Sequence, residues 1–142
     1  MIKFPDEEFV EVEIQEDFDI IKARARARVF AEALGFGIVD QTRIATAVSE
    51  IARNALVYGG GGKMTLSATK GRRGLEMVIV DHGPGIPNVD RVFIENYPKR
   101  GIGLGLGLQG AKRLMDEFYI DSKPGVGTKV TMRKWLPSGS RR

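Results

Sequence analysis

Apolar and acidic residues alternate from Phe9 to Ile14, and this period of two predicts a strand with one solvated face. Apolar residues then recur at spacings of three and four, which predicts a helix with its N-cap at Asp17 and its end near Gly35. The stripe of this helix that we expect to face the core consists of Phe18, Ile21, Ala25, Val29 and Ala33. Its basic residues project on different faces, so we interpret them as solvated, with a surface for an acidic partner as the alternative: Lys22, Arg24, Arg26 and Arg28.

A second helix is predicted from Asp40, a candidate N-cap, to about Tyr58. The glycines at 59–62 end it. Its apolar stripe consists of Ile44, Val48, Ile51 and Ala55. Two strands follow at 64–69 and 75–80, and the short turn at 71–74 predicts that they form a hairpin.

The remaining elements are predicted from changes in the pattern. Residues 81–100 are rich in Gly, Pro, Asn and charge without a sustained period, which predicts a long loop with one helical turn near Val92. We predict a third helix at 106–118, and strands at 119–122 and 128–135 on either side of a turn at 124–127.

Tight turns between neighbouring strands favour a mixed, mostly antiparallel sheet with helices packed on one face. The predicted fold class is therefore an α/β two-layer sandwich. With 142 residues, 42% of them hydrophobic, the chain is expected to form a single domain with one core over 1–136. Residues 137–142 have the composition of a flexible tail.

The amino-acid composition excludes several kinds of metal and catalytic site. The chain has no cysteine, which excludes disulfides, thiolate zinc sites and thiol nucleophiles, and its single histidine, His82, excludes a histidine metal cluster. No apolar run approaches the roughly 20 residues of a membrane span, and the amino terminus is too acidic and broken for a signal peptide. We expect a cytoplasmic protein that binds neither membrane nor nucleic acid. The net charge of +4 favours an anionic ligand or an acidic partner face.

Glu50 and Asn54 lie one turn apart on the second predicted helix. A step of about 100 degrees per residue puts both on one flank of the apolar stripe, where they would border a cleft. An Asn carbonyl can take one position on Mg²⁺, and a Glu one turn earlier can orient a water or hydroxyl toward a terminal phosphate. The same pair is also common on solvated helix faces.

Asp81 ends an apolar strand and is followed by Gly83 and Gly85, where the backbone can turn sharply and let a flat ring approach closely. A carboxylate only accepts hydrogen bonds, so it suits the amino group of adenine and would repel the carbonyl of guanine. This favours ATP over GTP. A turn that contains Asp without any ligand is the alternative for this segment taken alone.

The stretch 101–107 alternates glycine with apolar residues immediately before the third predicted helix. Exposed backbone N–H groups and the helix dipole would then point at the same spot, where an anion can bind. Lys99 and Arg100 precede it and could add positive charge, although a solvated basic pair is the alternative. Residues 105–110 match the pattern G-x-G-x-x-G, but no predicted strand precedes them, as a dinucleotide-binding fold requires. The sequence also contains no Walker A loop.

Taken together, these segments resemble the GHKL ATPases, the Bergerat-fold superfamily that includes gyrase, Hsp90, sensor kinases and MutL. The matching segments look like its N, G1, G2 and G3 boxes, over about residues 10–136: Glu50-x-x-x-Asn54, Asp81-x-Gly83-x-Gly85, the glycine run 101–107, and Gly125-x-Gly127-Thr128. Within that superfamily, the short chain and the stretches 35–50 and 112–118 are most similar to the RsbT-like switch proteins. These are bacterial serine/threonine kinases related to the RsbW anti-sigma kinases.

The resemblance implies a role for each matching residue. Glu50 matches the catalytic general base and Asn54 the magnesium ligand, while Thr128 matches a hydroxyl that helps Asp81 to hold the adenine through water. Residues 86–102 correspond to the ATP lid. The full set expected to bind Mg-ATP is Asn54, Asp81, Gly83, Gly85, Lys99, Arg100, Gly101, Gly103, Gly105, Gly107, Leu108 and Thr128. Val57 departs from the family, because many sensor kinases have a phosphate-contacting Lys there, and His82 inherits no role.

By resemblance, we expect an Mg-ATP-dependent serine/threonine protein kinase that phosphorylates STAS-domain partners of a stressosome-type partner-switching system. It would then activate a downstream output, typically a PP2C-type phosphatase. The alternative is an ATP-dependent binding module, such as an anti-sigma factor, that sequesters its partner without significant phosphoryl transfer. An isolated hydrolase is disfavoured, because the chain has no second domain for ATP closure to drive.

Overall fold

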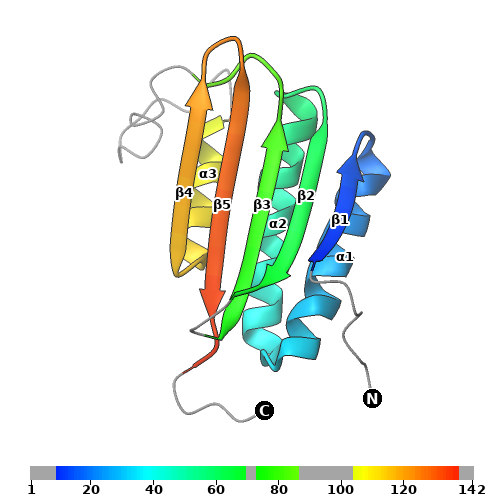
Figure 1. The fold of residues 1–142 in the computed structure, drawn as a ribbon, viewed down its shortest axis with the longest axis vertical. Helices are drawn as coiled ribbons and strands as arrows, with labels where there is room; N and C mark the ends of the chain where they lie inside the picture. The colour runs from blue at the N-terminus through cyan, green and yellow to red at the C-terminus, as the bar shows by residue number, and fades with distance from the viewer. Residues whose placement is uncertain (1–8, 70–72, 87–103, 138–142) are drawn as a thin grey trace.

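Three helices cover one face of a five-stranded sheet in the computed structural model, which describes residues 9–69, 73–86 and 104–137 (Figure 1). The chain order is β1 (Phe9–Ile14), α1 (Asp17–Leu34), α2 (Ile38–Val57), β2 (Gly62–Ala68), β3 (Gly74–Asp81), α3 (Leu104–Leu114), β4 (Glu117–Lys123) and β5 (Gly127–Trp135). The strands lie in the order β1-β2-β3-β5-β4, and all four pairings are antiparallel. The predicted α/β two-layer sandwich is confirmed, with a sheet that is wholly antiparallel over the described residues.

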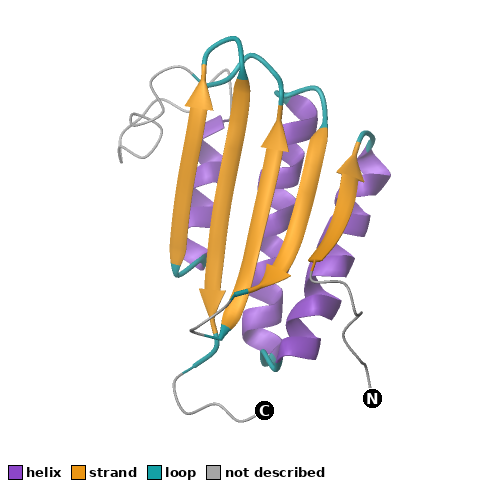
Figure 2. Ribbon diagram, in the orientation of Figure 1, coloured by secondary structure: helices purple, strands orange, loops and turns teal. Residues whose placement is uncertain are grey.

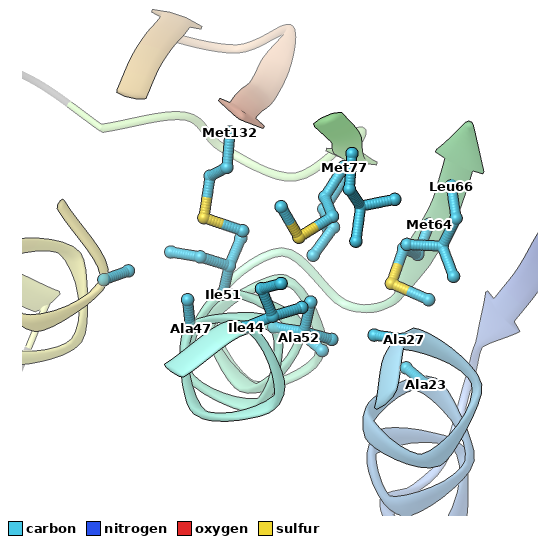
Figure 3. Packing of buried hydrophobic residues seen from close by; sticks show 14 of the residues in the cluster. Ala23, Ala27, Ile44, Ala47, Ile51, Ala52, Met64, Leu66, Met77 and Met132 are labelled. Carbon is cyan, nitrogen blue, oxygen red and sulfur yellow. The ribbon is translucent and has the colours of Figure 1, made fainter. Parts of the chain in front are cut away.

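The two layers are plain in Figure 2, where the helices lie behind the sheet and leave its front face uncovered. Side chains alternate between the faces of a strand, so every second residue points at the helices. Methionines on three neighbouring strands, Met64, Met77 and Met132, meet Ile44 and Ile51 of α2 in the core (Figure 3). Flexible thioether side chains fill the irregular space between a flat sheet and a round helix.

Helix α2 lies at the centre of the helical layer, packed against both α1 and α3. Its predicted stripe is buried as expected, because these positions repeat on one face of a helix: Ile44, Val48, Ile51 and Ala55. The helix begins at Ile38 with Gly37 as its N-cap, so Asp40 lies inside the first turn and is not the cap that was predicted. The acid still lies where the helix dipole favours a negative charge.

Helix α1 buries a different face from the predicted one. Phe18, Ile21 and Val29 are 62%, 54% and 49% exposed, and the residues that face the core are Ile20, Ala23, Ala27, Phe30 and Ala31. Both sets repeat at helical spacing, so periodicity alone could not choose between them. The three alanines decide the choice, because their small side chains let α1 pack closely against α2 and the sheet.

The N-terminus of α1 is also one residue from the prediction, since Glu16 is the N-cap and Asp17 the first helical residue. The stabilising carboxylate is that of Asp19, whose Oδ2 accepts hydrogen bonds from the backbone N–H groups of Gln15 and Glu16. The bond from Gln15 is the main cause that lowers the pKa of the Asp19 carboxyl below its ordinary value. At the other end, Gly35 adopts the left-handed conformation expected of a C-terminal glycine.

Helix α3 begins at Leu104 and ends at Leu114, so the predicted span 106–118 is too late at both ends. Residues 117 and 118 belong to β4, where Phe118 pairs with Met132 of β5. Strand pairing therefore overrides the helical period of this stretch. The Nζ atom of Lys134 donates a hydrogen bond to the Leu114 carbonyl and satisfies one of the open acceptors at the helix end.

Parts of three predictions lie outside the described residues: the long loop beyond residue 86, the hairpin turn at 70–72 and the tail from residue 138. The turn at 124–126 is described and joins β4 to β5, as predicted. No helix in the described part of the chain has the length and apolar character needed to cross a membrane.

Candidate functional site

A cavity of about 130 Å³ opens between the C-terminal half of α2, the end of β3 and the start of α3. Five of the residues predicted to bind nucleotide line it: Asn54, Asp81, Gly85, Leu108 and Thr128. They come from both layers and from segments far apart in the chain. Ile51, Ile79 and Val130 supply apolar walls, so the space suits a flat ring whose polar edge meets the few polar groups present.

Asp81 supplies the carboxylate of this cavity and is 9% exposed. Its Oδ1 accepts a hydrogen bond of 2.9 Å from the backbone N–H of Gly83. Among the described residues this is the only hydrogen bond to the carboxylate, so Oδ2 can accept one from a ligand. The carboxylate is thus held by the turn that follows β3 while one oxygen stays available.

Gly59, which the sequence pattern predicts only as part of the glycine run that ends the second helix, lies against the Asp81 side chain and lines the same cavity. A Cβ at this position would overlap the Asp81 carboxyl group. Only glycine therefore lets the chain leave α2 at this point without displacing the acid. The signal in the sequence was its place just beyond the helix that carries Asn54, but the contact with Asp81 depends on tertiary packing.

Thr128 faces Asp81 across the β3–β5 pairing and also lines the cavity. Its Oγ1 lies 2.8 Å from the Oγ of Ser122, its neighbour on β4. Ser122 Oγ in turn accepts a hydrogen bond of 2.7 Å from the backbone N–H of Ile86. No motif in the sequence predicts a role for Ser122, yet it connects the segment after Asp81 to the hydroxyl in the cavity.

Glu50 and Asn54 lie side by side against the first turns of α3. A Cβ placed on Gly107 would lie 3.1 Å from Glu50 Oε1 and 3.2 Å from Asn54 Nδ2. Both side chains therefore approach α3 at Gly107. Because glycine has no Cβ, both fit there without a close contact. Glu50 does not line the cavity itself but is the neighbour of Asn54 at its edge.

Substitution of two glycines three residues apart on α3 tests this contact. Both Gly107→Ala and Gly110→Ala gain helix propensity of about 1 kcal/mol. A Cβ at Gly110 meets nothing within 4 Å, so that variant should unfold at higher denaturant concentration with unchanged activity. Gly107→Ala should lose activity on the order of tenfold, because the new methyl group displaces Glu50 or Asn54. Equal activity in the two variants, measured beside urea unfolding curves, would contradict the arrangement.

The donor atoms at this edge fit a magnesium ion. Among the described residues nothing pairs with the buried Nδ2 of Asn54, and an unpaired amide N–H indicates a place where a ligand acceptor, such as a phosphate oxygen, is needed. The Asn54 carbonyl oxygen is a donor of the kind that Mg²⁺ prefers, and the Glu50 carboxylate lies beside it. In the described part of the chain no cluster of three or more His, Cys, Asp or Glu could hold a metal ion by itself. A metal here would thus take its other ligands from water and substrate phosphates.

The other predicted residues have mixed outcomes. Gly83 contacts Asp81, and Gly105 lies within the first turn of α3. Lys99, Arg100, Gly101 and Gly103 lie outside the described residues, so their part in phosphate binding stays a prediction. Val57 is exposed and does not line the cavity, and His82 borders other surface hollows.

Comparison with known proteins agrees with this geometry. The family model described as "Histidine kinase-like ATPase domain" matches residues 15–134. The serine/threonine-protein kinase RsbT of Bacillus subtilis is 46% identical over 127 residues, which cover 88% of this chain and 95% of that protein. The anti-sigma F factor of Clostridium acetobutylicum is 31% identical over 117 residues, 79% of this chain and 82% of that protein.

A crystal structure of the RsbU and RsbW domains of a Mycobacterium tuberculosis protein has the same fold, with a TM-score of 0.66. The match covers 94% of this chain and 34% of the longer chain, at 19% identity, and it therefore supports the fold alone.

Proposed function

Because this chain belongs to the histidine kinase-like ATPase domain family and is an RsbT-like serine/threonine protein kinase within it, we propose that it transfers the γ-phosphate of ATP to a hydroxyl of a STAS-domain partner. The observation that carries the proposal is the single cavity at which Asp81, Thr128 and Asn54 meet, with Glu50 beside Asn54. This arrangement supports the roles proposed for the three carriers: Asp81 for the base, Asn54 for the metal and Glu50 for the acceptor proton.

The adenine ring would occupy the part of the cavity between the apolar walls. Asp81 Oδ2 would accept a hydrogen bond from the exocyclic amino group, while Gly83 N–H holds Oδ1 in place. Ile51, Ile79 and Val130 would exclude water from the ring faces. The apolar walls and Asp81 Oδ2, which accepts no hydrogen bond from the described residues, support an adenine nucleotide as the ligand.

The phosphates would extend from the cavity toward Asn54 and the first turn of α3. The N-terminal N–H groups of a helix and its dipole favour negative charge, and α3 is an 11-residue helix. Asn54 would offer its carbonyl oxygen to Mg²⁺, which when bound neutralises charge on the phosphates. Lys99, Arg100, Gly101 and Gly103 are proposed to complete the phosphate site, following the family resemblance.

Glu50 is proposed as the general base of the transfer. Its carboxylate oxygen lies next to Asn54 and to the surface of Gly107, so an acceptor hydroxyl entering at this edge would meet the carboxylate. Glu50 would accept the hydroxyl proton as the oxygen attacks the γ-phosphate, and it would orient the hydroxyl before the attack. A protein that merely binds nucleotide has no need for a carboxylate here.

The partners follow from the resemblance to RsbT-like proteins. We propose that the acceptor is a Ser or Thr of a STAS-domain protein in a partner-switching system of the stressosome type, in the cytoplasm. Phosphorylation would release the kinase to activate an output protein, typically a PP2C-type phosphatase. The 46% identity to a serine/threonine-protein kinase over most of the chain supports this class of reaction.

The decisive test combines purified protein with purified STAS-domain proteins from the same genome and ATP labelled on its γ-phosphate. We expect magnesium-dependent transfer of label to one STAS-domain protein, and mass spectrometry should place it on a Ser or Thr. No transfer to any of them, with ATP still bound, would refute the kinase proposal.

A second candidate is favoured by the similarity to anti-sigma F factors, at about 30% identity. In that case the main output would be nucleotide-dependent sequestration of a partner. Pull-down with and without nucleotide separates the two functions. A sequestering module retains its partner unmodified in the presence of Mg-ATP, whereas a kinase of the proposed type releases a phosphorylated one.

A further inference from the structure

Ser122 connects three groups through one hydroxyl. Its Oγ accepts the Ile86 N–H at 2.7 Å and lies 2.8 Å from Thr128 Oγ1 and 3.3 Å from the Gly127 carbonyl oxygen. Ser122 does not line the cavity, but Thr128 does. Any effect of Ser122 on a ligand therefore passes through Thr128.

The hydroxyl protons of Ser122 and Thr128 can be arranged in two ways. A hydroxyl has one proton and two lone pairs, and Ile86 N–H occupies one lone pair of Ser122. Ser122 either donates to Gly127, in which case Thr128 donates to Ser122, or donates to Thr128 itself. In the second arrangement the Thr128 proton is free to point into the cavity.

The distances favour the second arrangement once a ligand offers an acceptor. At 3.3 Å the contact with Gly127 is long for an O–H···O hydrogen bond, whereas 2.8 Å to Thr128 is near the usual length. Loss of the weak bond is then offset by a new bond from Thr128 to the ligand. Donation by Ser122 also polarises the Thr128 hydroxyl and strengthens it as a donor.

A donor at Thr128 beside an acceptor at Asp81 matches one kind of purine edge. Adenine presents a donor, its 6-amino group, next to an acceptor, N1. Guanine presents the reverse order, an acceptor at O6 and a donor at N1. Asp81 and Thr128 are paired across β3 and β5, so the two side chains address adjacent atoms of one ligand edge, directly or through a water.

We propose that Ser122 is a positioning residue for base selection: by donating to Thr128 Oγ1, its hydroxyl orients the Thr128 proton toward N1 of a 6-aminopurine nucleotide. The inference rests on the proposed function, because it assumes that adenine occupies the cavity. It adds a residue on an edge strand of the sheet, β4, to the base site.

The test measures the dissociation constants of ADP and 1-deaza-ADP, in which CH replaces N1, by calorimetry. The wild type should bind 1-deaza-ADP roughly three- to tenfold more weakly than ADP, the value of one neutral hydrogen bond. In Ser122→Ala this ratio should fall below about twofold, because the Thr128 hydroxyl loses its orientation and its polarising donor. Ser122→Thr retains the hydroxyl and should restore the ratio.

Ser67→Ala is the matched control, since Ser67 lies on β2, one position before its last residue, and outside the cavity lining. It should leave the ratio unchanged. If Ser122→Ala does not fold, Ser122→Cys keeps a similar volume with a weak donor and should give a reduced ratio.

Equal weakening of both ligands by Ser122→Ala would overturn the proposal, because a purely structural role through Ile86 predicts that result. Wild-type affinity for both ligands in Ser122→Ala would overturn it as well, because it would show that Ser122 does not act on the base site. Failure of the premise looks different: a wild type that binds neither nucleotide would refute adenine binding in the cavity, whereas absence of phosphate transfer with ADP still bound would refute only the kinase reaction.

Discussion

The Glu50→Gln variant should transfer phosphate to a STAS-domain substrate at least about 100-fold more slowly than the wild type, with little change in ADP affinity. General-base catalysis contributes roughly 100- to 10,000-fold, and an amide cannot take up the acceptor proton. Gln has nearly the same shape as Glu, so the contacts with Gly107 and Asn54 are retained. Single-turnover label transfer and calorimetry with ADP measure the two quantities separately.

The matched control is Glu32→Gln on α1, where the carboxylate is exposed and distant from the cavity lining. It removes the same charge and should leave transfer unaltered. Label transfer by Glu50→Gln at the wild-type rate would remove Glu50 from the mechanism. A parallel loss of ADP affinity would instead assign Glu50 to the binding of the metal–nucleotide complex.

Asp81→Asn should weaken ADP binding by roughly 10- to 100-fold, the cost of losing one hydrogen bond to a charged acceptor. The Asn side chain can still accept the Gly83 N–H through its carbonyl oxygen, so the turn after β3 should persist. The group facing the base would then be an amide NH₂, a donor that opposes the adenine amino group. The same donor suits O6 of guanine, so the preference for ADP over GDP should decrease or reverse.

Asp121→Asn controls for the change of charge, because Asp121 is exposed on β4, which pairs with β5, and does not line the cavity. ADP affinity should be unchanged in that variant. Wild-type affinity in Asp81→Asn, measured with urea unfolding curves to show an intact fold, would place the adenine elsewhere.

Local patterns were sufficient for most of the elements. The alternation in β1 and the stripe of α2 each require only a few neighbouring residues to recognise, and both are confirmed. The same holds for the turn at 124–126, which contains the turn-forming residues Pro124 and Gly125. In these segments the residues that favour the element also satisfy its packing, so local and global preferences agree.

Two predictions, the buried face of α1 and the end of α3, were wrong for the same reason. Helix α1 has an apolar stripe on each of two opposite faces, and packing against α2 buried the one with the smaller side chains. Residues 117 and 118 continue the helical pattern of α3, but pairing of Phe118 with Met132 put them in β4. In each case a partner distant in sequence decided between alternatives that were locally equivalent.

The candidate site, too, was predictable only in part from the sequence. The sequence by itself determined the residue types, because a carboxylate after an apolar strand, an Asn one helical turn after a Glu, and glycines near a helix start are visible without coordinates. Only the tertiary structure decided that Gly59 makes room for Asp81 and that Ser122 joins Ile86, 36 residues away, to Thr128. Such contacts depend on which strands pair and on how closely the two layers approach. A short stretch of sequence specifies neither the pairing nor the separation of the layers.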